Sequence, residues 1–133
     1  MTTLEVIASK ALPIKLRDPL GEFLGLTAAG QPIFYTLMDA GRFAGHLCPT
    51  VTLAFEMARA GLARLYPGSQ PMRGEVRVSI ASPPDAFANG PVGQVIGYIT
   101  GAAGETGFKG ISGRFNRQGL LRFDAGQTPF GSV

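Results

Sequence analysis

The segment from residue 49 to residue 66 constrains the fold most, because it carries the clearest helical periodicity of the chain. Apolar side chains recur at helical spacing along one face: Val51, Phe55, Ala58, Leu62 and Leu65. Pro49 suits the first turn of a helix, where its missing N–H loses no hydrogen bond, and Pro67-Gly68 ends the pattern. We therefore predict an amphipathic helix over Pro49–Tyr66 that packs one face against a core.

The segments around this helix follow different patterns. Val76, Val78 and Ile80 alternate with polar residues, and a period of two predicts a strand with one buried face. Residues 91–102 return to helical spacing and predict a second helix. Residues 32–38 are rich in β-forming side chains and predict a strand whose last residues could begin a helix.

The last third of the chain contains two short segments separated by a turn. Ile111–Asn116 and Leu120–Asp124 flank Arg117-Gln118-Gly119, and this spacing predicts a β-hairpin. The resulting order of elements, β-α-β-α-β-β, predicts an α+β fold. In such a fold we expect helices packed on one side of a mixed or antiparallel sheet.

Glycine and proline interrupt regular secondary-structure patterns in the first part of the chain. Residues 1–31 predict a strand or loop, with a short helix at Pro19–Leu26 as an alternative, and a break is expected from Gly41 to Gly45. Neither internal repeats nor a linker divides the sequence, so we predict a single domain over residues 1–133. Hydrophobic residues make up 45% of the chain and charged residues 16%, which excludes an intrinsically disordered protein.

The cysteine count, the N-terminus and the charge suggest the compartment and the partners. Cys48 is the only cysteine, which excludes an intramolecular disulfide and fits a reducing compartment. The sequence has no apolar run of about 18 residues and no signal-like start, so we expect a cytoplasmic protein without a membrane partner. The net charge is +3, but the arginines are scattered and form no nucleic-acid motif, so no nucleic-acid partner is expected. Arg114 and Arg117 flank the predicted hairpin turn and are candidates for a small anionic ligand, with surface ion pairs as the alternative.

Glycine is concentrated in one part of the sequence. The chain has 19 glycines, and Gly93, Gly97 and Gly101 recur every four residues in the second predicted helix. Each lowers helix stability by about 1 kcal/mol relative to alanine, so we expect a close approach to this face that compensates. The approaching group could belong to the same subunit, to a partner subunit or to a flat cofactor. A later repeat of glycine every third residue, from Gly101 to Gly113, follows a helix rather than a strand and so does not predict nucleotide binding.

The residues with the richest chemistry lie in Ala44-Gly45-His46-Leu47-Cys48-Pro49. The only histidine and the only cysteine stand two residues apart, directly before the first predicted helix. Pro49 places Cys48 at or beside the N-cap, where free amides and the helix dipole favour the thiolate. A thiolate and an imidazole both suit zinc or another late transition metal. The alternatives are a buried cysteine beside a hydrogen-bonded histidine, and a Cys-His nucleophile.

The turn Gly45-His46-Leu47-Cys48-Pro49, after Phe43 and before an amphipathic helix, resembles the FmdE-like family, which takes its name from a component of formylmethanofuran dehydrogenase. Later segments are also similar to that family in their order: Asp85, Ile99-Thr100-Gly101-Ala102 and Gly107-Phe108-Lys109-Gly110. The resemblance spans roughly residues 34–123. It implies an α+β core shared with the catalytic domain of glyceraldehyde-phosphate dehydrogenases, a metal held by His46 and Cys48, and a homodimer. It also implies that the glycine-rich segment faces the turn that contains these two ligands.

This chain departs from the family in the number of ligands. Many members place a further cysteine where this chain has Ala102, and others place one near the position of Ser82-Pro83-Pro84. An oxygen ligand or a second subunit must therefore complete the site. Asp85 and Glu105 are candidate oxygen ligands, with turn and capping roles as the alternatives.

We therefore expect a metal- or metallocofactor-binding module, accessory to redox or cofactor metabolism, with zinc at His46 and Cys48. Haem is a specific alternative, because His or Cys can be an axial ligand and the face of Gly93, Gly97 and Gly101 could admit a flat ring. A metal-free, homo-oligomeric interaction protein with a decayed site is the alternative from another class. The sequence contains no complete catalytic constellation, so it leaves open whether the protein is an enzyme.

Overall fold

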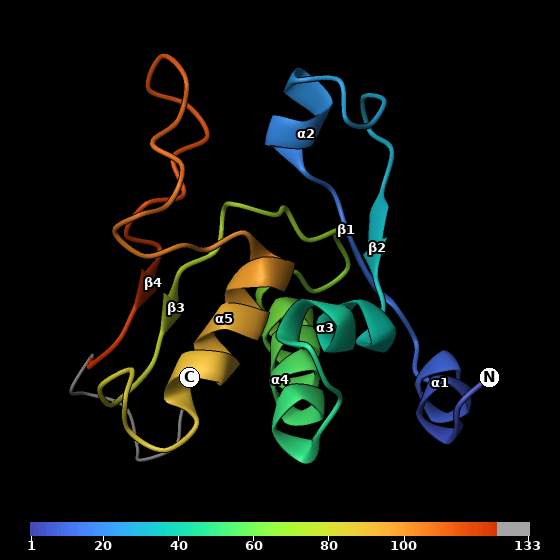
Figure 1. Cartoon of the computed structure of the whole chain (residues 1–133). Helices are drawn as coiled ribbons and strands as arrows, with labels where there is room; N and C mark the ends of the chain where they lie inside the picture. The colour runs from blue at the N-terminus through green and yellow to red at the C-terminus, as the bar shows by residue number, and fades with distance from the viewer. Residues whose placement is uncertain (125–133) are drawn as a thin grey trace.

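The computed structural model describes residues 1–124, and Figure 1 shows them as an α+β fold. In chain order the elements are α1 (Thr3–Ser9), β1 (Ile14–Leu16), α2 (Pro19–Phe23), β2 (Ile33–Tyr35), α3 (Leu37–Ala44), α4 (Pro49–Leu65), β3 (Val78–Ser79), α5 (Asn89–Thr100) and β4 (Leu121–Arg122). The expected α+β class is confirmed. The domain predicted over residues 1–133 includes residues 125–133, which lie outside the described part.

Helix α4 forms the centre of the core and packs against α5 and α3. The largest fully buried side chains are Phe55, Leu16, Ile96, Ile99, Val51 and Val95. Complete burial of a side chain of this kind contributes roughly 1.5–3 kcal/mol relative to its exposed state. The apolar faces of α4 and α5, joined by Leu16 of β1, therefore supply most of the core.

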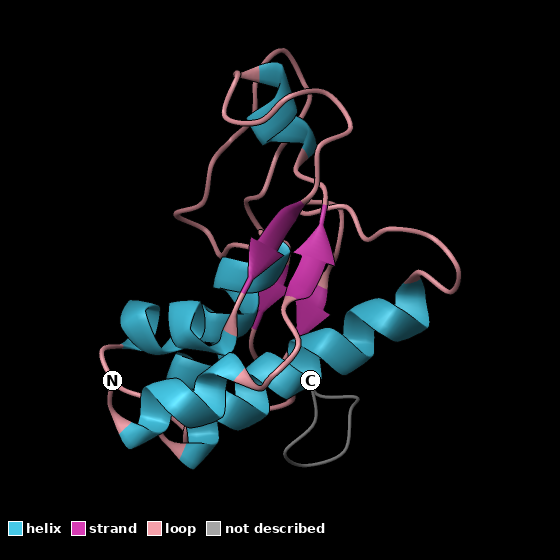
Figure 2. Ribbon diagram, turned by 90° about the vertical axis from the view of Figure 1, so that its right-hand side faces the viewer, coloured by secondary structure: helices cyan, strands magenta, loops and turns pink. Residues whose placement is uncertain are grey.

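The strands form two separate two-stranded pairs rather than one sheet. β1 pairs antiparallel with β2, with Lys15 opposite Phe34, whereas β3 pairs in parallel with β4, with Val78 opposite Leu121. Figure 2 shows most of the helices gathered towards one end of these strands and α2 set apart at the other end. Phe23 of α2 contacts Phe115 in a loop of the chain's last third.

Helices α4 and α5 confirm the two helices predicted from periodicity. α4 begins at Pro49, and its predicted apolar face is buried except at the last turn, where Leu65 is exposed. α5 is displaced by two residues towards the N-terminus and ends before Gly101, whose φ of 79° lies in the left-handed region. No helix among residues 1–124 is both long enough and apolar enough to cross a membrane.

The β-hairpin predicted over Ile111–Asn116 and Leu120–Asp124 is wrong. Ile111 bridges Arg114 in a tight turn and does not pair with the later run. Ser112, with a φ of 50°, has a left-handed conformation that a regular strand does not contain. The first run therefore folds back on itself, and the second run is left to pair elsewhere.

The second run pairs with β3. The segment around β3 keeps the predicted alternation, because Val76, Val78 and Ile80 are buried and the residues between them are exposed. The backbone N–H groups of Val78 and Ile80 donate to the carbonyls of Leu120 and Arg122, both at 2.8 Å. A parallel pairing joins segments far apart in the chain and contains no tight turn. The turn residues that help to predict a hairpin are therefore absent here.

The break predicted from Gly41 to Gly45 is wrong except at its end. α3 begins with a capping box in which Thr36 and Asp39 each accept the other's backbone N–H. Gly41 lies inside this helix, where an added Cβ would be 3.4 Å from the Cβ of Leu47. Only Gly45 interrupts the helix, with a φ of 87°, and it turns the chain towards α4.

Residues 1–31 contain more helix than the sequence predicts. α1 is absent from the sequence-based prediction, although Thr2 and Glu5 form a capping box at its start. The short helix allowed at Pro19–Leu26 is confirmed in its first part, as α2, with Asp18 as its N-cap. The capping residues explain both helices better than apolar periodicity does, because each helix is too short to show a clear repeat.

Candidate functional site

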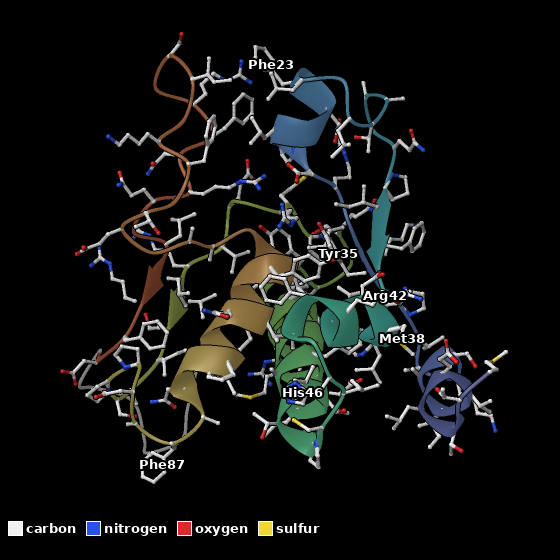
Figure 3. The ribbon with its side chains drawn as sticks, viewed as in Figure 1. Phe23, Tyr35, Met38, Arg42, His46 and Phe87 are labelled. Atoms are coloured by element: carbon white, nitrogen blue, oxygen red, sulfur yellow. The ribbon has the colours of Figure 1, made fainter. Side chains whose placement is uncertain are left out.

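The turn between α3 and α4 brings His46 and Cys48 together. Gly45 ends α3 in the left-handed conformation, and Cys48 is the N-cap residue of α4, followed by Pro49 at the first helical position. Cys48 is half-buried and His46 is exposed. Figure 3 shows the His46 ring beside α4. The predicted placement of both residues at this helix start is therefore what the structure has.

The start of α4 favours the thiolate form of Cys48. The backbone N–H of Val51 lowers the pKa of Cys48 most, partial burial acts against it, and the N–H of Thr50 and the side chain of His46 lower it further. The net result is a pKa below the ordinary value of a cysteine. The amides of the first helical turn have no intrahelical acceptors, so they stabilise the negative sulfur. Cys48 is thus easier to deprotonate than an ordinary cysteine, and its thiolate form is a soft metal ligand.

Two donors alone are not a complete metal site. In the described part of the chain, no group of three or more His, Cys, Asp and Glu side chains could hold a metal ion. Asp85 and Glu105, the candidate oxygen ligands, are exposed, and neither forms such a group with His46 and Cys48. A metal at this turn therefore needs ligands from outside the described chain.

An apolar hollow of about 530 Å³ opens beside Cys48, between α1 and the start of α4. Leu4 and Ile7 of α1 and Leu53 of α4 line it, with exposed fractions of 49%, 57% and 58%. Grouped apolar side chains that remain this exposed are typical of a surface that another molecule covers. The two candidate ligands thus stand next to exposed apolar surface.

The glycines at positions 93, 97 and 101 face their own chain. A Cβ at Gly93 would lie 2.6 Å from Cζ of Phe123, and a Cβ at Gly97 would lie 2.6 Å from the carbonyl oxygen of Ala102. Gly101 has the left-handed conformation described above. Close approach within the subunit, one of the three predicted reasons for these glycines, therefore accounts for their missing side chains.

The same glycines line a hollow that is separate from the apolar hollow beside Cys48. They share it with Phe43 and Tyr98, whose rings stack with centroids 4.6 Å apart and an interplanar angle of 13°. The glycine-rich helix thus meets the end of α3 at Phe43 rather than at Cys48 itself. A cofactor-binding role for Gly93, Gly97 and Gly101 stays a prediction. Neither His46 nor Cys48 lines the hollow that contains these glycines.

Arg114 and Arg117 have different environments. Arg114 lies over the rings of Phe115 and Phe23, at 4.6 and 5.5 Å from their centroids, and the two rings contact each other. These contacts hold α2 against the loop. Arg117 is not a surface residue: its side chain is 12% exposed, and its Nη2 donates to Oδ1 of Asp18 at 2.7 Å. The ion pair considered for Arg117 is therefore part-buried and not on the surface.

Asp18, Arg73 and Arg117 form a buried charge cluster that sequence reasoning missed. Asp18 is 4% exposed, and its Oδ2 accepts a hydrogen bond from Nη1 of Arg73 at 3.0 Å. Its Oδ1 accepts from Arg117 and also from the backbone N–H of Gly21 at 3.1 Å. Nη2 of Arg73 also donates to the carbonyl of Tyr98, at the C-terminal end of α5, at 2.6 Å. One carboxylate thus joins three distant segments of the chain.

The members of the cluster shift each other's pKa. Burial raises the pKa of Asp18, but the Gly21 amide and the two arginines outweigh it and lower the pKa overall. Burial and the like charge of Arg73 lower the pKa of Arg117. Tyr35, labelled near the end of β2 in Figure 3, lies under Arg73 with its ring centroid 5.4 Å from the guanidinium carbon. The charges of the cluster therefore act on one another, and the ring of Tyr35 lies against Arg73.

No local sequence pattern predicts this cluster. Asp18 and Arg73 are 55 residues apart, and Asp18 and Arg117 are 99 residues apart. The one available signal was Asp18 directly before Pro19, a combination typical of a helix start. That signal predicts the cap of α2 but says nothing about the two arginines.

Comparison with known proteins identifies no relative. No family model, no curated protein and no solved structure matches the chain. The resemblance to the FmdE-like family therefore stays a prediction, based on the residues of the His46–Cys48 turn and the segments that follow it.

Proposed function

We propose that this protein is a transition-metal-binding module, with zinc as the metal and with His46 and Cys48 as the ligands from each chain. The observation that carries the proposal is their juxtaposition at the first turn of α4, where the helix amides favour a thiolate. Thiolate sulfur and imidazole nitrogen are preferred donors for zinc. The family resemblance supports an accessory role in redox or cofactor metabolism, and the single free cysteine is consistent with a reducing cytoplasm.

The donor set fits half of a structural zinc site. Such sites usually hold the metal by four protein ligands in a tetrahedron, and the described chain brings two to this turn. A second copy related by a two-fold axis would bring the same two residues again and complete a Cys₂His₂ set. Leu4, Ile7 and Leu53, which are exposed beside the turn, supply apolar surface for this homodimer.

Each part of the turn has a defined task in this proposal. The amides of Val51 and Thr50 lower the pKa of Cys48, so that less free energy is needed to deprotonate it for binding. His46 projects from the exposed side of the turn, where a second copy can approach. Zinc in a closed Cys₂His₂ set supplies a cross-link between the copies rather than an open coordination position.

The proposal is tested on protein purified without a histidine tag. Metal analysis by mass spectrometry is combined with the molar mass from light scattering and with an absorption spectrum. We expect roughly one zinc per two chains and a dimeric mass. His46→Ala and Cys48→Ser should lose the zinc. Glu56→Gln changes an exposed carboxylate that lines the same hollow, so this matched control should keep it.

Other outcomes identify the alternatives. Apo-protein that binds no added zinc would contradict the proposal. If that metal-free protein is still a dimer, and His46→Ala leaves its mass unchanged, the interaction-protein hypothesis takes its place. A Soret band lost in either ligand variant would replace zinc by haem.

A further inference from the structure

A second hollow, distinct from the apolar hollow beside Cys48, brings charged and aromatic side chains together. We call it the arginine hollow; its volume is about 490 Å³, and it is lined by Phe43, Arg73, Gly97, Tyr98, Phe108 and Arg117, among others. It lies between the end of α3, the glycine face of α5 and the loop before β4. Neither His46 nor Cys48 lines it.

The charges beneath the arginine hollow do not balance. Two guanidinium groups, Arg73 and Arg117, share the single carboxylate of Asp18, so the cluster keeps one excess positive charge. The arginine side chains are 14% and 12% exposed, so water screens this charge only in part. Burial and, after it, the like charge of Arg73 lower the pKa of Arg117. A single negative charge brought into the hollow would balance the excess positive charge.

Of the two arginines, Arg117 has donors to spare. Arg73 is occupied, because it bonds Asp18 through Nη1 and the carbonyls of Tyr98 and Ile99 through Nε and Nη2. The only side-chain hydrogen bond of Arg117 within residues 1–124 is the one from Nη2 to Asp18. Its Nε and Nη1 groups lie on different edges of the guanidinium, and each remains able to donate a hydrogen bond to a carboxylate oxygen.

The walls of the arginine hollow are suited to a flat apolar body. Phe43 stacks on Tyr98, which also meets Tyr35 edge-to-face at 5.0 Å, so these rings hold each other in place. Phe108 stands on the opposite loop with 42% of its surface exposed. Gly97 adds no side chain to the floor. An aromatic ring entering here would meet the rings of Phe43, Tyr98 and Phe108, which line the hollow.

The sign and size of the cluster's excess charge also limit which ligands the arginine hollow could bind. The excess is a single positive charge, and the C-terminal carbonyls of α5 at Tyr98 and Ile99 add partial negative charge nearby. A dianion such as a phosphate monoester would overcompensate, whereas a carboxylate would balance the cluster. We therefore propose that the arginine hollow binds a small aromatic carboxylate, with its carboxylate on Arg117 and its ring between Phe43 and Phe108.

The probe for this site is 2-naphthoate, and its neutral isostere 2-naphthamide is the matched ligand control. Titration of ¹⁵N-labelled protein should shift the amide signals of Gly97, Tyr98 and Gly101, and calorimetry should give saturable binding. Loss of a charged hydrogen bond typically lowers affinity about tenfold or more, so Arg117→Gln should weaken naphthoate binding by at least about that factor. Naphthamide should bind weakly to the wild type and to the variant alike.

Arg114→Gln is the matched protein control, because it removes the same charge from an exposed arginine that does not line the arginine hollow. It should bind naphthoate as the wild type does, and so should Cys48→Ser, which separates this site from the zinc proposal. If Arg117→Gln does not fold, Phe108→Ala serves instead and should weaken binding. The proposal is overturned if wild-type protein shows no shifts in the hollow at millimolar naphthoate, or if naphthamide binds equally well.

Discussion

Oδ1 of Asp18 lies 2.7 Å from Nη2 of Arg117, and this contact joins residues 99 positions apart in the chain. Because Asp18 also caps α2 and binds Arg73, removal of its charge leaves two part-buried guanidinium groups without their shared carboxylate. The contact therefore stabilises the fold more than a single hydrogen bond would suggest.

Asp18→Ala should lower the free energy of unfolding by about 3–5 kcal/mol, the usual effect of removing one partner of a buried ion pair. Urea denaturation followed by circular dichroism measures it. Asp85→Ala, at an exposed carboxylate in a loop, is the control and should change stability by no more than about 0.5 kcal/mol. Equal effects of the two substitutions would show that the buried cluster contributes nothing special.

Acid should destabilise the protein partly through Asp18. Its pKa is lowered in the folded state because the Gly21 amide and the two arginines outweigh burial, so the folded state binds a proton less readily than the unfolded state. The associated stability is fully present well above the ordinary pKa of 3.8 and is lost as the pH falls from there through the lower folded value. Unfolding curves at several pH values below about 5 should fall less steeply in Asp18→Asn than in the wild type. Parallel curves would contradict this origin.

Two glycines on neighbouring helices should respond to alanine with opposite signs. Gly61 lies in α4 with nothing within 4 Å of an added Cβ, so Gly61→Ala should stabilise the protein by up to about 1 kcal/mol. At Gly93 in α5 the added Cβ would meet the Phe123 ring at 2.6 Å, so Gly93→Ala should destabilise it. Thermal unfolding of the two variants measures both effects. Stabilisation by both would mean that the contact with Phe123 yields easily.

The thiol of Cys48 should ionise at a lower pH than the thiol of an unstructured cysteine. Alkylation rates of metal-free protein, measured against pH, should show a midpoint below that of an unstructured cysteine peptide, because the Val51 and Thr50 amides favour the thiolate. His46→Ala should move the midpoint upward, since His46 also lowers the pKa of Cys48. A midpoint equal to that of the free peptide would remove the electrostatic argument for this turn.

Local sequence patterns predicted the parts of the fold that depend on neighbouring residues. The spacing of Val51, Phe55 and Leu62 predicted α4, and Pro49 marked its first turn. The same logic placed Cys48 at the start of that helix. The capping boxes at α1 and α3 are equally local, but neither helix is long enough to show a clear apolar repeat, so periodicity does not predict them.

Local sequence patterns did not predict the pairings between segments that are far apart in the chain. The run at Leu121–Arg122 could have paired with the segment just before it, but β3 presented a free strand edge above a buried apolar face, and the parallel pairing formed instead. The glycine face of α5 was recognised, but what approaches it was decided by where Phe123 and Ala102 lie.

What the sequence by itself determined is therefore the helix with its apolar face, and the adjacent histidine and cysteine at its start, because both depend on spacing along a few turns of chain. What only the tertiary structure decided is which distant groups meet: Asp18 with Arg73 and Arg117, and the rings of Phe43 and Tyr98 beside them. The physical reason is that burial of an unpaired charge is costly, so a buried carboxylate is stable only where the folded chain places cations beside it. Those cations can come from any position in the sequence.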